Sequence, residues 1–151
     1  MSTATAAALP AASRRIDAAA VLLRTGLGVM FIAHALLKYF VFTLPGTGKF
    51  FASLGLPAGL GYLVFAAELI GGVLLVAGVY TRIVALALVP VLLGALWAHS
   101  GNGWLFTAPN GGWEYPAFLT LAAVIVGLLG DGVTERAASI FRVFGGAQVA
   151  R

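Results

Sequence analysis

Long apolar stretches separated by short polar ones predict four helices that each cross a membrane. The clearest stretch runs from Leu56 to Arg82 and is almost wholly apolar. A run of about 20 apolar residues can cross a bilayer core of about 30 Å as a helix. Thr81 and Arg82 are expected to form a tight turn after it, and Pro90 to kink the next helix. The predicted spans cover residues 17–42, 58–80, 83–99 and 113–130.

The composition supports an all-α integral membrane protein. Of the 151 residues, 61% are hydrophobic and 9% are charged, and the mean hydropathy is +1.02. Soluble domains carry about 25% charged residues. The chain has no cysteine, which excludes thiol chemistry, disulfides and metal ligation through sulfur. No basic face interleaved with aromatic residues is present, so nucleic-acid binding is not predicted.

The basic residues predict the orientation of the bundle. With four spans, one side of the membrane receives only lysines and the other receives most of the arginines. Cytoplasmic segments carry an excess of basic residues, so both termini are expected in the cytoplasm. Lys38 and Lys49 lie on or near the outer side, and the inner side holds Arg14, Arg15, Arg82, Arg136, Arg142 and Arg151.

The remaining segments are assigned to tails and connections. Residues 1–16 are expected to form a flexible cytoplasmic tail, since the apolar run after them is too long for a cleaved signal peptide. Residues 17–131 form the membrane bundle. Residues 132–151 form a second cytoplasmic tail and a candidate amphipathic helix on the membrane surface. Residues 43–57 combine a turn with an apolar, aromatic segment that is a candidate interfacial helix.

Glu68 is the anomaly, because it stands near the middle of a span. A lone carboxylate in lipid is costly unless it is neutral, paired or facing a polar interior. His34 and Lys38 are four residues apart and share one face of the first span. His99 closes the third span and Glu114 opens the fourth. The topology therefore places these five residues together, with Glu68 at the floor of an outer polar cluster.

Each polar residue also has a structural interpretation. Glu68 could be paired with His34 or with Arg24, which lies in the inner half of the first span and could also extend to the cytoplasmic surface. His34 could bond across helices, and Lys38 could extend to the outer interface. His99 and Glu114 lie close to the loops, so they could instead have a structural or solvent-exposed role there.

Three kinds of function could use this cluster. A quinone could accept hydrogen bonds from His34 or Lys38, with Glu68 or Glu114 relaying protons. Glu68 and His34 are then the candidate catalytic residues, and His34, Lys38, His99 and Glu114 the candidate cofactor-binding residues. His34 and His99 could instead be axial ligands to a haem, a less favoured hypothesis, or ligands to another metal; no residue is assigned as a metal ligand. The cluster could also be purely structural, in a protein that anchors a partner.

The sequence resembles the DoxX family of small bacterial membrane proteins. The likeness covers roughly residues 22–130. It rests on Arg24 with Gly26 and Gly28, and on the segments FIAHALLKYF, FFASLGLP, AELIGGVLLVAGVYTR, HSGNGW and GGWEYP. The resemblance implies a four-helix bundle in the bacterial cytoplasmic (inner) membrane.

The resemblance also implies a redox role. Members of the family resemble subunits of thiosulfate:quinone oxidoreductase, and one actinobacterial member is associated with a membrane redox complex. We therefore expect a membrane subunit of a quinone-linked redox system, with protein partners in the lipid bilayer. The alternative is a non-catalytic anchor or assembly protein for a redox or stress-response complex. A transporter is less favoured without an inverted repeat. Small residues such as Ala67 and Gly71 favour packing within the chain over a homo-oligomer face.

Overall fold

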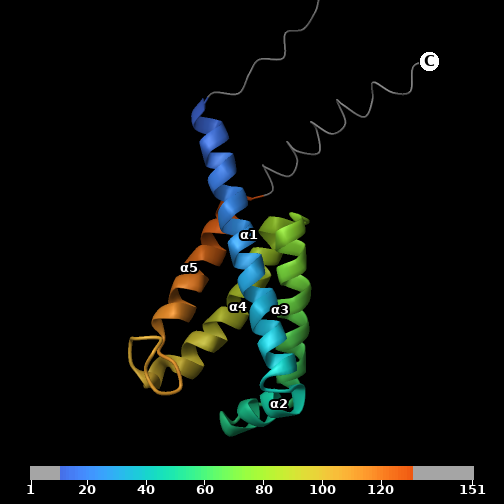
Figure 1. Ribbon diagram of the computed structural model, residues 1–151, viewed down its shortest axis with the longest axis vertical. Coiled ribbons are helices and arrows are strands. Elements are labelled where there is room, and N and C mark those ends of the chain that lie inside the picture. Colours follow the sequence, from blue (N-terminus) through green and yellow to red (C-terminus); the bar gives the residue numbers. More distant parts are fainter. Residues whose placement is uncertain (1–10, 131–151) are drawn as a thin grey trace, which may run out of the picture.

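The computed structural model describes residues 11–130, and these residues are helical with no strand. α2 is short, and the other four α-helices are long and mostly apolar. A turn of 3-10 helix, η1, follows α4 (Figure 1). The elements are α1 Ala11–Phe40, α2 Leu44–Ser53, α3 Gly59–Ala77, α4 Thr81–His99, η1 Ser100–Asn102 and α5 Glu114–Leu129.

The four long helices form two closely packed pairs, α1 with α3 and α4 with α5. The pairs lie together at the end that holds the α3–α4 turn. From there α4 tilts away from α3, and α2 lies across the opposite end of the bundle (Figure 1). The helices are thus packed together in one half of the bundle and spread apart in the other.

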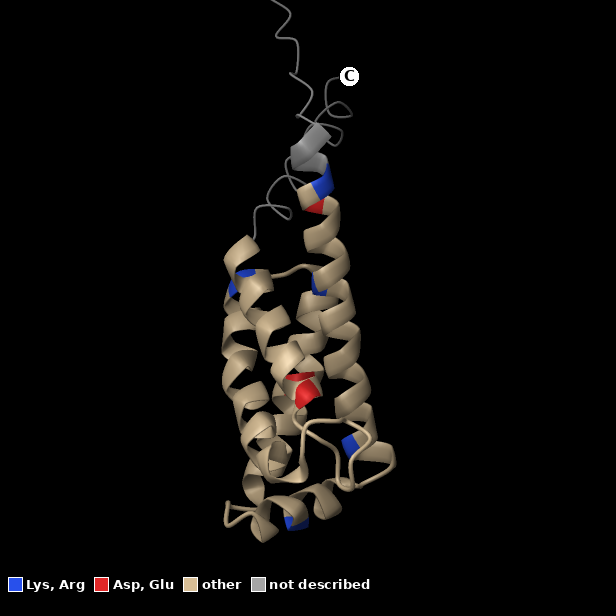
Figure 2. Cartoon of the chain, turned by 90° about the vertical axis from the view of Figure 1, so that its left-hand side faces the viewer, with Lys and Arg blue, Asp and Glu red and all other residues tan. Residues whose placement is uncertain are grey.

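The surface of this bundle is suited to lipid. Within the described residues, three helical stretches are long and apolar enough to cross a membrane: Arg15–Phe40, Gly59–Ala77 and Thr81–Asn102. Many large apolar side chains point outward, with Leu22 exposed by 74% and Leu128 by 76%. Charged residues are sparse along the bundle, and most lie towards its ends (Figure 2). Exposed apolar surface on this scale indicates a membrane environment, so the chain is a multi-pass helical membrane protein.

The helices follow the predicted spans with local differences. α1 begins at Ala11, before the predicted start of the first span, and most of the predicted tail 1–16 lies outside the described residues. The predicted tail 132–151 lies wholly outside them. α5 has 16 residues, about 24 Å of helix, and is the shortest of the four.

Two turns differ from expectation or refine it. Thr81 and Arg82 are the first residues of α4, and the tight turn lies before them, where Gly78 and Tyr80 have positive φ of 74° and 50°. Glycine adopts such a conformation readily, which explains Gly78 at the end of α3. Residues 43–57 contain α2, and its first turn is capped by the Thr43 hydroxyl, which accepts a hydrogen bond from the Gly46 amide. Pro90 lies inside α4, which continues through it.

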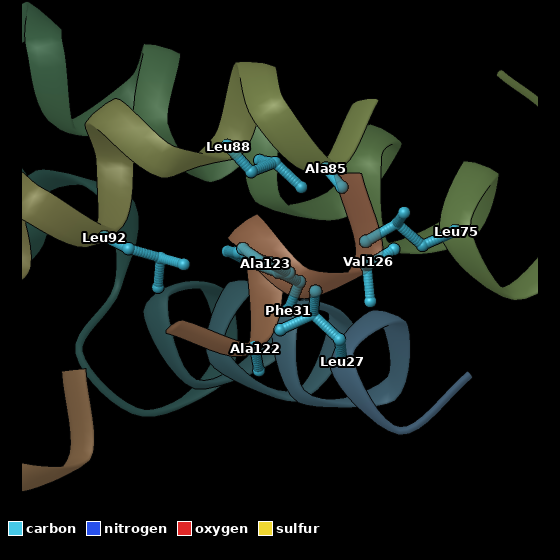
Figure 3. Close-up of a cluster of buried hydrophobic side chains, with 9 residues drawn as sticks. All are labelled: Leu27, Phe31, Leu75, Ala85, Leu88, Leu92, Ala122, Ala123 and Val126. Atoms are coloured by element: carbon cyan, nitrogen blue, oxygen red, sulfur yellow. The ribbon is translucent and has the colours of Figure 1, made fainter. Parts of the chain in front are cut away.

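The buried apolar core, drawn in Figure 3, lies towards the α3–α4 turn, since it includes Leu75 from the last turn of α3 and Ala85 from the first part of α4. All four long helices contribute to it, and α4 and α5 supply small residues that allow close approach. Its members are Leu27, Phe31, Leu75, Ala85, Leu88, Leu92, Ala122, Ala123 and Val126. Because these residues fill only one half of the bundle, the diverging half is left for a cavity.

Candidate functional site

A cavity of about 1070 Å³ lies in the diverging half of the bundle. All four long helices and α2 line it, and most of the lining is apolar, including Leu37, Val64 and Trp97. Phe31 and Leu92 belong both to this lining and to the buried core, so they separate the two. Small-molecule sites occupy about 300–1,000 Å³ and combine apolar walls with a few placed polar groups. The cavity has the size and the character of such a site.

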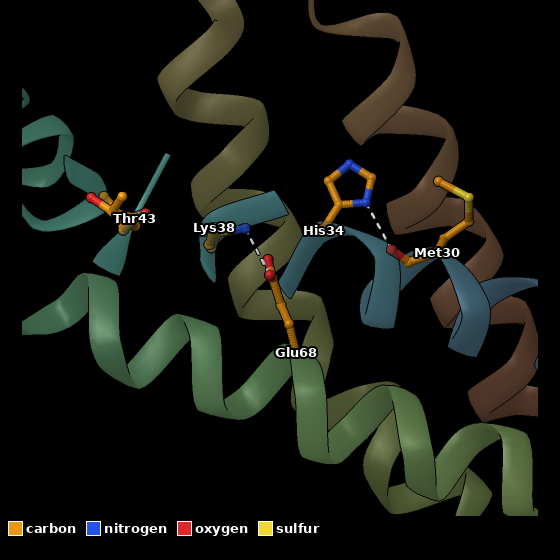
Figure 4. A network of polar contacts seen from close by, with 6 residues as sticks. Met30, His34, Lys38, Thr43 and Glu68 are labelled. Atoms are coloured by element: carbon orange, nitrogen blue, oxygen red, sulfur yellow. Dashed lines mark hydrogen bonds and ion pairs between the residues drawn. The ribbon is translucent and has the colours of Figure 1, made fainter. Parts of the chain in front are cut away.

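An ion pair between Lys38 and Glu68 forms part of the cavity wall (Figure 4). Lys38 Nζ lies 2.6 Å from Glu68 Oε2, and the two side chains are only 17% and 8% exposed. Lys38 comes from the last turn of α1, where the helix dipole favours a cation, and Glu68 from the middle of α3. The carboxylate that appeared anomalous in the sequence therefore has a partner, and that partner is Lys38 rather than His34 or Arg24.

His34 lines the same cavity one turn before Lys38. Its Nδ1–H donates to the Met30 carbonyl oxygen at 2.8 Å, within α1 rather than across helices (Figure 4). The imidazole stacks on the Tyr115 ring of α5, with centroids 5.7 Å apart and 22° between the planes. The Tyr115 hydroxyl donates to Met30 Sδ at 3.4 Å. The ring is therefore held in one orientation by two neighbours.

The other two candidates, His99 and Glu114, serve the connection between α4 and α5. His99 Nδ1–H donates to the carbonyl oxygens of Asn110 and Gly111 at 3.0 and 3.1 Å. Glu114 Oε1 accepts a hydrogen bond of 2.9 Å from the Phe106 amide. His99 still lines the cavity, but Glu114 does not belong to its lining. The structure thus brings His34, Lys38, Glu68 and His99 to one cavity and leaves Glu114 in the loop.

The donor atoms limit what this site could ligate. The Nδ1 atoms of His34 and His99 are both engaged with backbone carbonyls, which leaves Nε2 as the ligand atom of either ring. Among residues 11–130, no group of three or more His, Cys, Asp or Glu side chains could hold a metal ion.

Two residues of the site escaped the sequence analysis. Tyr115 stacks on His34, and Asn102 donates to the same two carbonyls as His99, at 3.1 and 2.9 Å. Tyr115 follows Glu114 at the start of the last span, and that position could have suggested it. Nothing in the spacing of Asn102 indicates its bonds, because they depend on the course of the loop.

Arg24 does not approach Glu68 as a partner. One of its terminal guanidinium nitrogens donates to the Leu75 carbonyl oxygen at 2.9 Å, with a second acceptor, the Val76 carbonyl oxygen, at 3.4 Å. These carbonyls belong to the last turn of α3, where the regular helical hydrogen bonds end. The Leu75 carbonyl oxygen also accepts from the Gly78 amide at 3.2 Å, so the guanidinium adds to the bonds that close this helix end. A basic side chain at a helix C-terminus can hydrogen-bond such carbonyls and complements the dipole. Arg24 therefore ties α1 to the end of α3.

We expect Arg24→Leu to lower the free energy of unfolding by about 1.5–3 kcal/mol, the usual contribution of a hydrogen bond to a charged group. Scanning fluorimetry of the detergent-solubilised protein would measure the loss. Arg24→Lys, which keeps the charge but not the planar donor group, should have a stability between that of Arg24→Leu and that of the wild type. Equal melting temperatures for Arg24→Leu and the wild type would contradict this role.

Known proteins resemble this chain in sequence. No solved structure matches the chain. Over 84 residues it is 39% identical to a Bacillus subtilis (strain 168) protein named "Putative oxidoreductase CatD", a match that covers 56% of this chain and 61% of that protein. The chain thus spans less than two thirds of this relative. The DoxX family model matches residues 19–101, from α1 through η1, which is more than half of the chain. The chain belongs to the DoxX family.

Proposed function

We propose that the protein is a membrane subunit of a quinone-linked redox system and that the cavity receives the quinone head group. The observation that carries this proposal is the cavity itself, with mostly apolar walls and a polar cluster of Lys38, Glu68 and His34. The Bacillus subtilis relative carries the name "Putative oxidoreductase CatD", which supports a redox role.

The cavity suits the chemistry of a quinone in three respects. The apolar walls can enclose the ring and the start of an isoprenoid tail. Lys38 uses one of its three N–H donors on Glu68, so it has donors left for a ligand oxygen. Glu68 and His34 are titratable groups that could exchange the protons coupled to quinone chemistry. In this proposal Lys38 donates a hydrogen bond to an oxygen of the quinone, and Glu68 and His34 exchange protons with the bound ligand.

The proposal assigns sulfur chemistry to another protein. A chain without cysteine cannot carry a persulfide, so oxidation of a substrate such as thiosulfate would take place on a partner. The chain would then provide the quinone site in the membrane and the attachment point for that partner.

We further propose four spans in the bacterial inner membrane with both termini in the cytoplasm. Arg15 and Arg82 lie at the end that holds the start of α1 and the α3–α4 turn, and Lys38 and Lys49 come from the segments at the opposite end. The positive-inside rule favours the arginine end in the cytoplasm. α5 would be the short fourth span, and the bilayer can thin locally to match it.

The test is equilibrium binding of a short-chain ubiquinone to the protein in lipid nanodiscs, with tryptophan fluorescence as the readout. Trp97 lines the cavity, so a bound quinone should quench it. We expect saturable binding that weakens at least about tenfold in Lys38→Met/Glu68→Leu, which removes the ion pair and leaves His34 as the remaining member of the polar cluster. A tenfold loss corresponds to about 1.4 kcal/mol, within the range of a charged hydrogen bond.

Lys49→Met is the matched control, since Lys49 lies on α2 outside the cavity lining and should leave binding unchanged. Absence of saturable binding to the folded wild type would contradict the proposal. Retention of a partner protein by such a quinone-free chain would then favour the anchor hypothesis.

A further inference from the structure

The hydrogen bond of His34 determines what its free nitrogen can do. The Met30 carbonyl oxygen can only accept, so Nδ1 must carry the proton at a separation of 2.8 Å. In a neutral imidazole the other nitrogen then has a lone pair and no proton. Among the described residues nothing bonds to Nε2, and His34 lines the cavity. The histidine therefore offers the cavity an acceptor.

The ring cannot easily reverse this polarity. A flip of the imidazole would replace Nδ1 by a carbon and break the bond to Met30. The opposite tautomer would place two lone pairs against each other at the same short distance. Tyr115, stacked at 5.7 Å, also restricts the plane of the ring. The structure thus fixes an acceptor at this position as long as the ring is neutral.

Glu68 supplies a second acceptor on the same wall. Its Oε2 atom receives the Lys38 hydrogen bond of 2.6 Å, while no residue of the described chain bonds to Oε1. Lys38 is the neighbouring donor. A ligand that satisfies this wall therefore needs hydroxyl groups that can donate to Nε2 or Oε1 and can also accept from Lys38.

We propose that the cavity binds the reduced, dihydroxy form of a quinone in preference to the oxidised form, with His34 Nε2 accepting from one ligand hydroxyl. This inference rests on the proposed function and adds to it the redox state of the ligand. A quinol has two O–H donors, whereas a quinone has only carbonyl acceptors. A quinone oxygen beside Nε2 would face a lone pair and leave that acceptor unsatisfied.

The preference has a thermodynamic consequence. A site that binds the reduced form more tightly raises the reduction potential of the bound couple, by about 30 mV for each tenfold preference in a two-electron reaction. The cavity would therefore make a bound quinone easier to reduce.

The experiment compares three ligands in nanodiscs under anaerobic conditions at pH 8. They are a short-chain ubiquinol, the matching ubiquinone and the dimethyl ether of the quinol, which keeps the ring but has no O–H donor. For the wild type we expect the quinol to bind about tenfold or more tightly than the other two, the effect of one satisfied hydrogen bond.

In His34→Phe, which keeps an aromatic ring beside Tyr115 but removes the Nε2 acceptor, the preference for the quinol should fall at least about threefold from that of the wild type, while the acceptor at Glu68 Oε1 remains. Lys49→Met should keep the preference of the wild type. Equal binding of quinol and ether to the wild type would overturn the inference without the need for any variant, as would tighter binding of the quinone. If no ligand of the three binds, the proposed function itself fails.

Discussion

Replacing Glu68 by alanine is expected to lower the free energy of unfolding by about 3–5 kcal/mol, the usual cost of breaking a buried ion pair from one side. Lys38 Nζ lies 2.6 Å from Glu68 Oε2, and the lysine side chain is only 17% exposed. Without the carboxylate its ammonium group would face apolar walls with no counter-ion. Scanning fluorimetry in detergent, with size-exclusion chromatography to detect aggregation, would measure the loss.

The double variant Lys38→Met/Glu68→Leu tests whether the loss of stability in Glu68→Ala comes from the unpaired ammonium group or from the loss of the ion pair itself. Both replacements are apolar and of similar size, so the stability should return to within about 1–2 kcal/mol of the wild type. A Glu68→Ala variant as stable as the wild type would show that water or a lipid head group reaches Lys38 inside the bundle. The ion pair would then not hold the fold together.

The helices were largely predictable from the apolar pattern. In lipid the backbone must satisfy its own hydrogen bonds, so a long apolar stretch has little alternative to a helix. Glu68 and Pro90 interrupt the apolar pattern, yet both lie inside continuous helices. The Thr81–Arg82 turn was misplaced because a positive φ at Tyr80, which few residues adopt, is invisible in the apolar pattern.

The site was predictable only in part. The spacing of His34 and Lys38 shows a shared face, and the mid-span position of Glu68 demands a partner. His34 and Arg24 are the partners expected from the sequence, and the pairing with Lys38 instead depends on how far α1 is shifted along α3, which spacing within one helix cannot give. In the structure this shift places Arg24 beside the end of α3 and the Lys38 ammonium beside Glu68.

The residues at the span ends show a different limit. His99 and Glu114 close and open neighbouring spans, so from the sequence both could face a cavity. Their partners are backbone groups of residues 106, 110 and 111, within a loop that turns at Asn110 with a φ of 67°. From its position in the sequence, a polar residue at the end of a span that binds a ligand therefore cannot be distinguished from one that hydrogen-bonds to a loop.

Gly28 and Gly72 set the contact between α1 and α3, and we expect Gly28→Ala to destabilise the protein by about 1–3 kcal/mol. A Cβ atom at Gly28 would lie 2.8 Å from the Gly72 carbonyl oxygen and 2.8 Å from Val76 Cγ2. A Cβ atom at Gly72 would meet the Gly28 carbonyl oxygen at the same distance. Since backbone cannot rotate away as a side chain can, the two helices must separate. Scanning fluorimetry would measure the loss.

Gly26→Ala is the matched control, because it lies two residues away on the same helix and its added Cβ meets no atom within 4 Å. Alanine favours a helix over glycine by up to about 1 kcal/mol, so this variant should be neutral or slightly stabilising. Equal effects at the two positions would contradict a close contact at Gly28. If Gly28→Ala also weakens quinone binding, the reason would be geometric: the same two helices carry Lys38 and Glu68, and separating them opens the ion pair in the cavity wall.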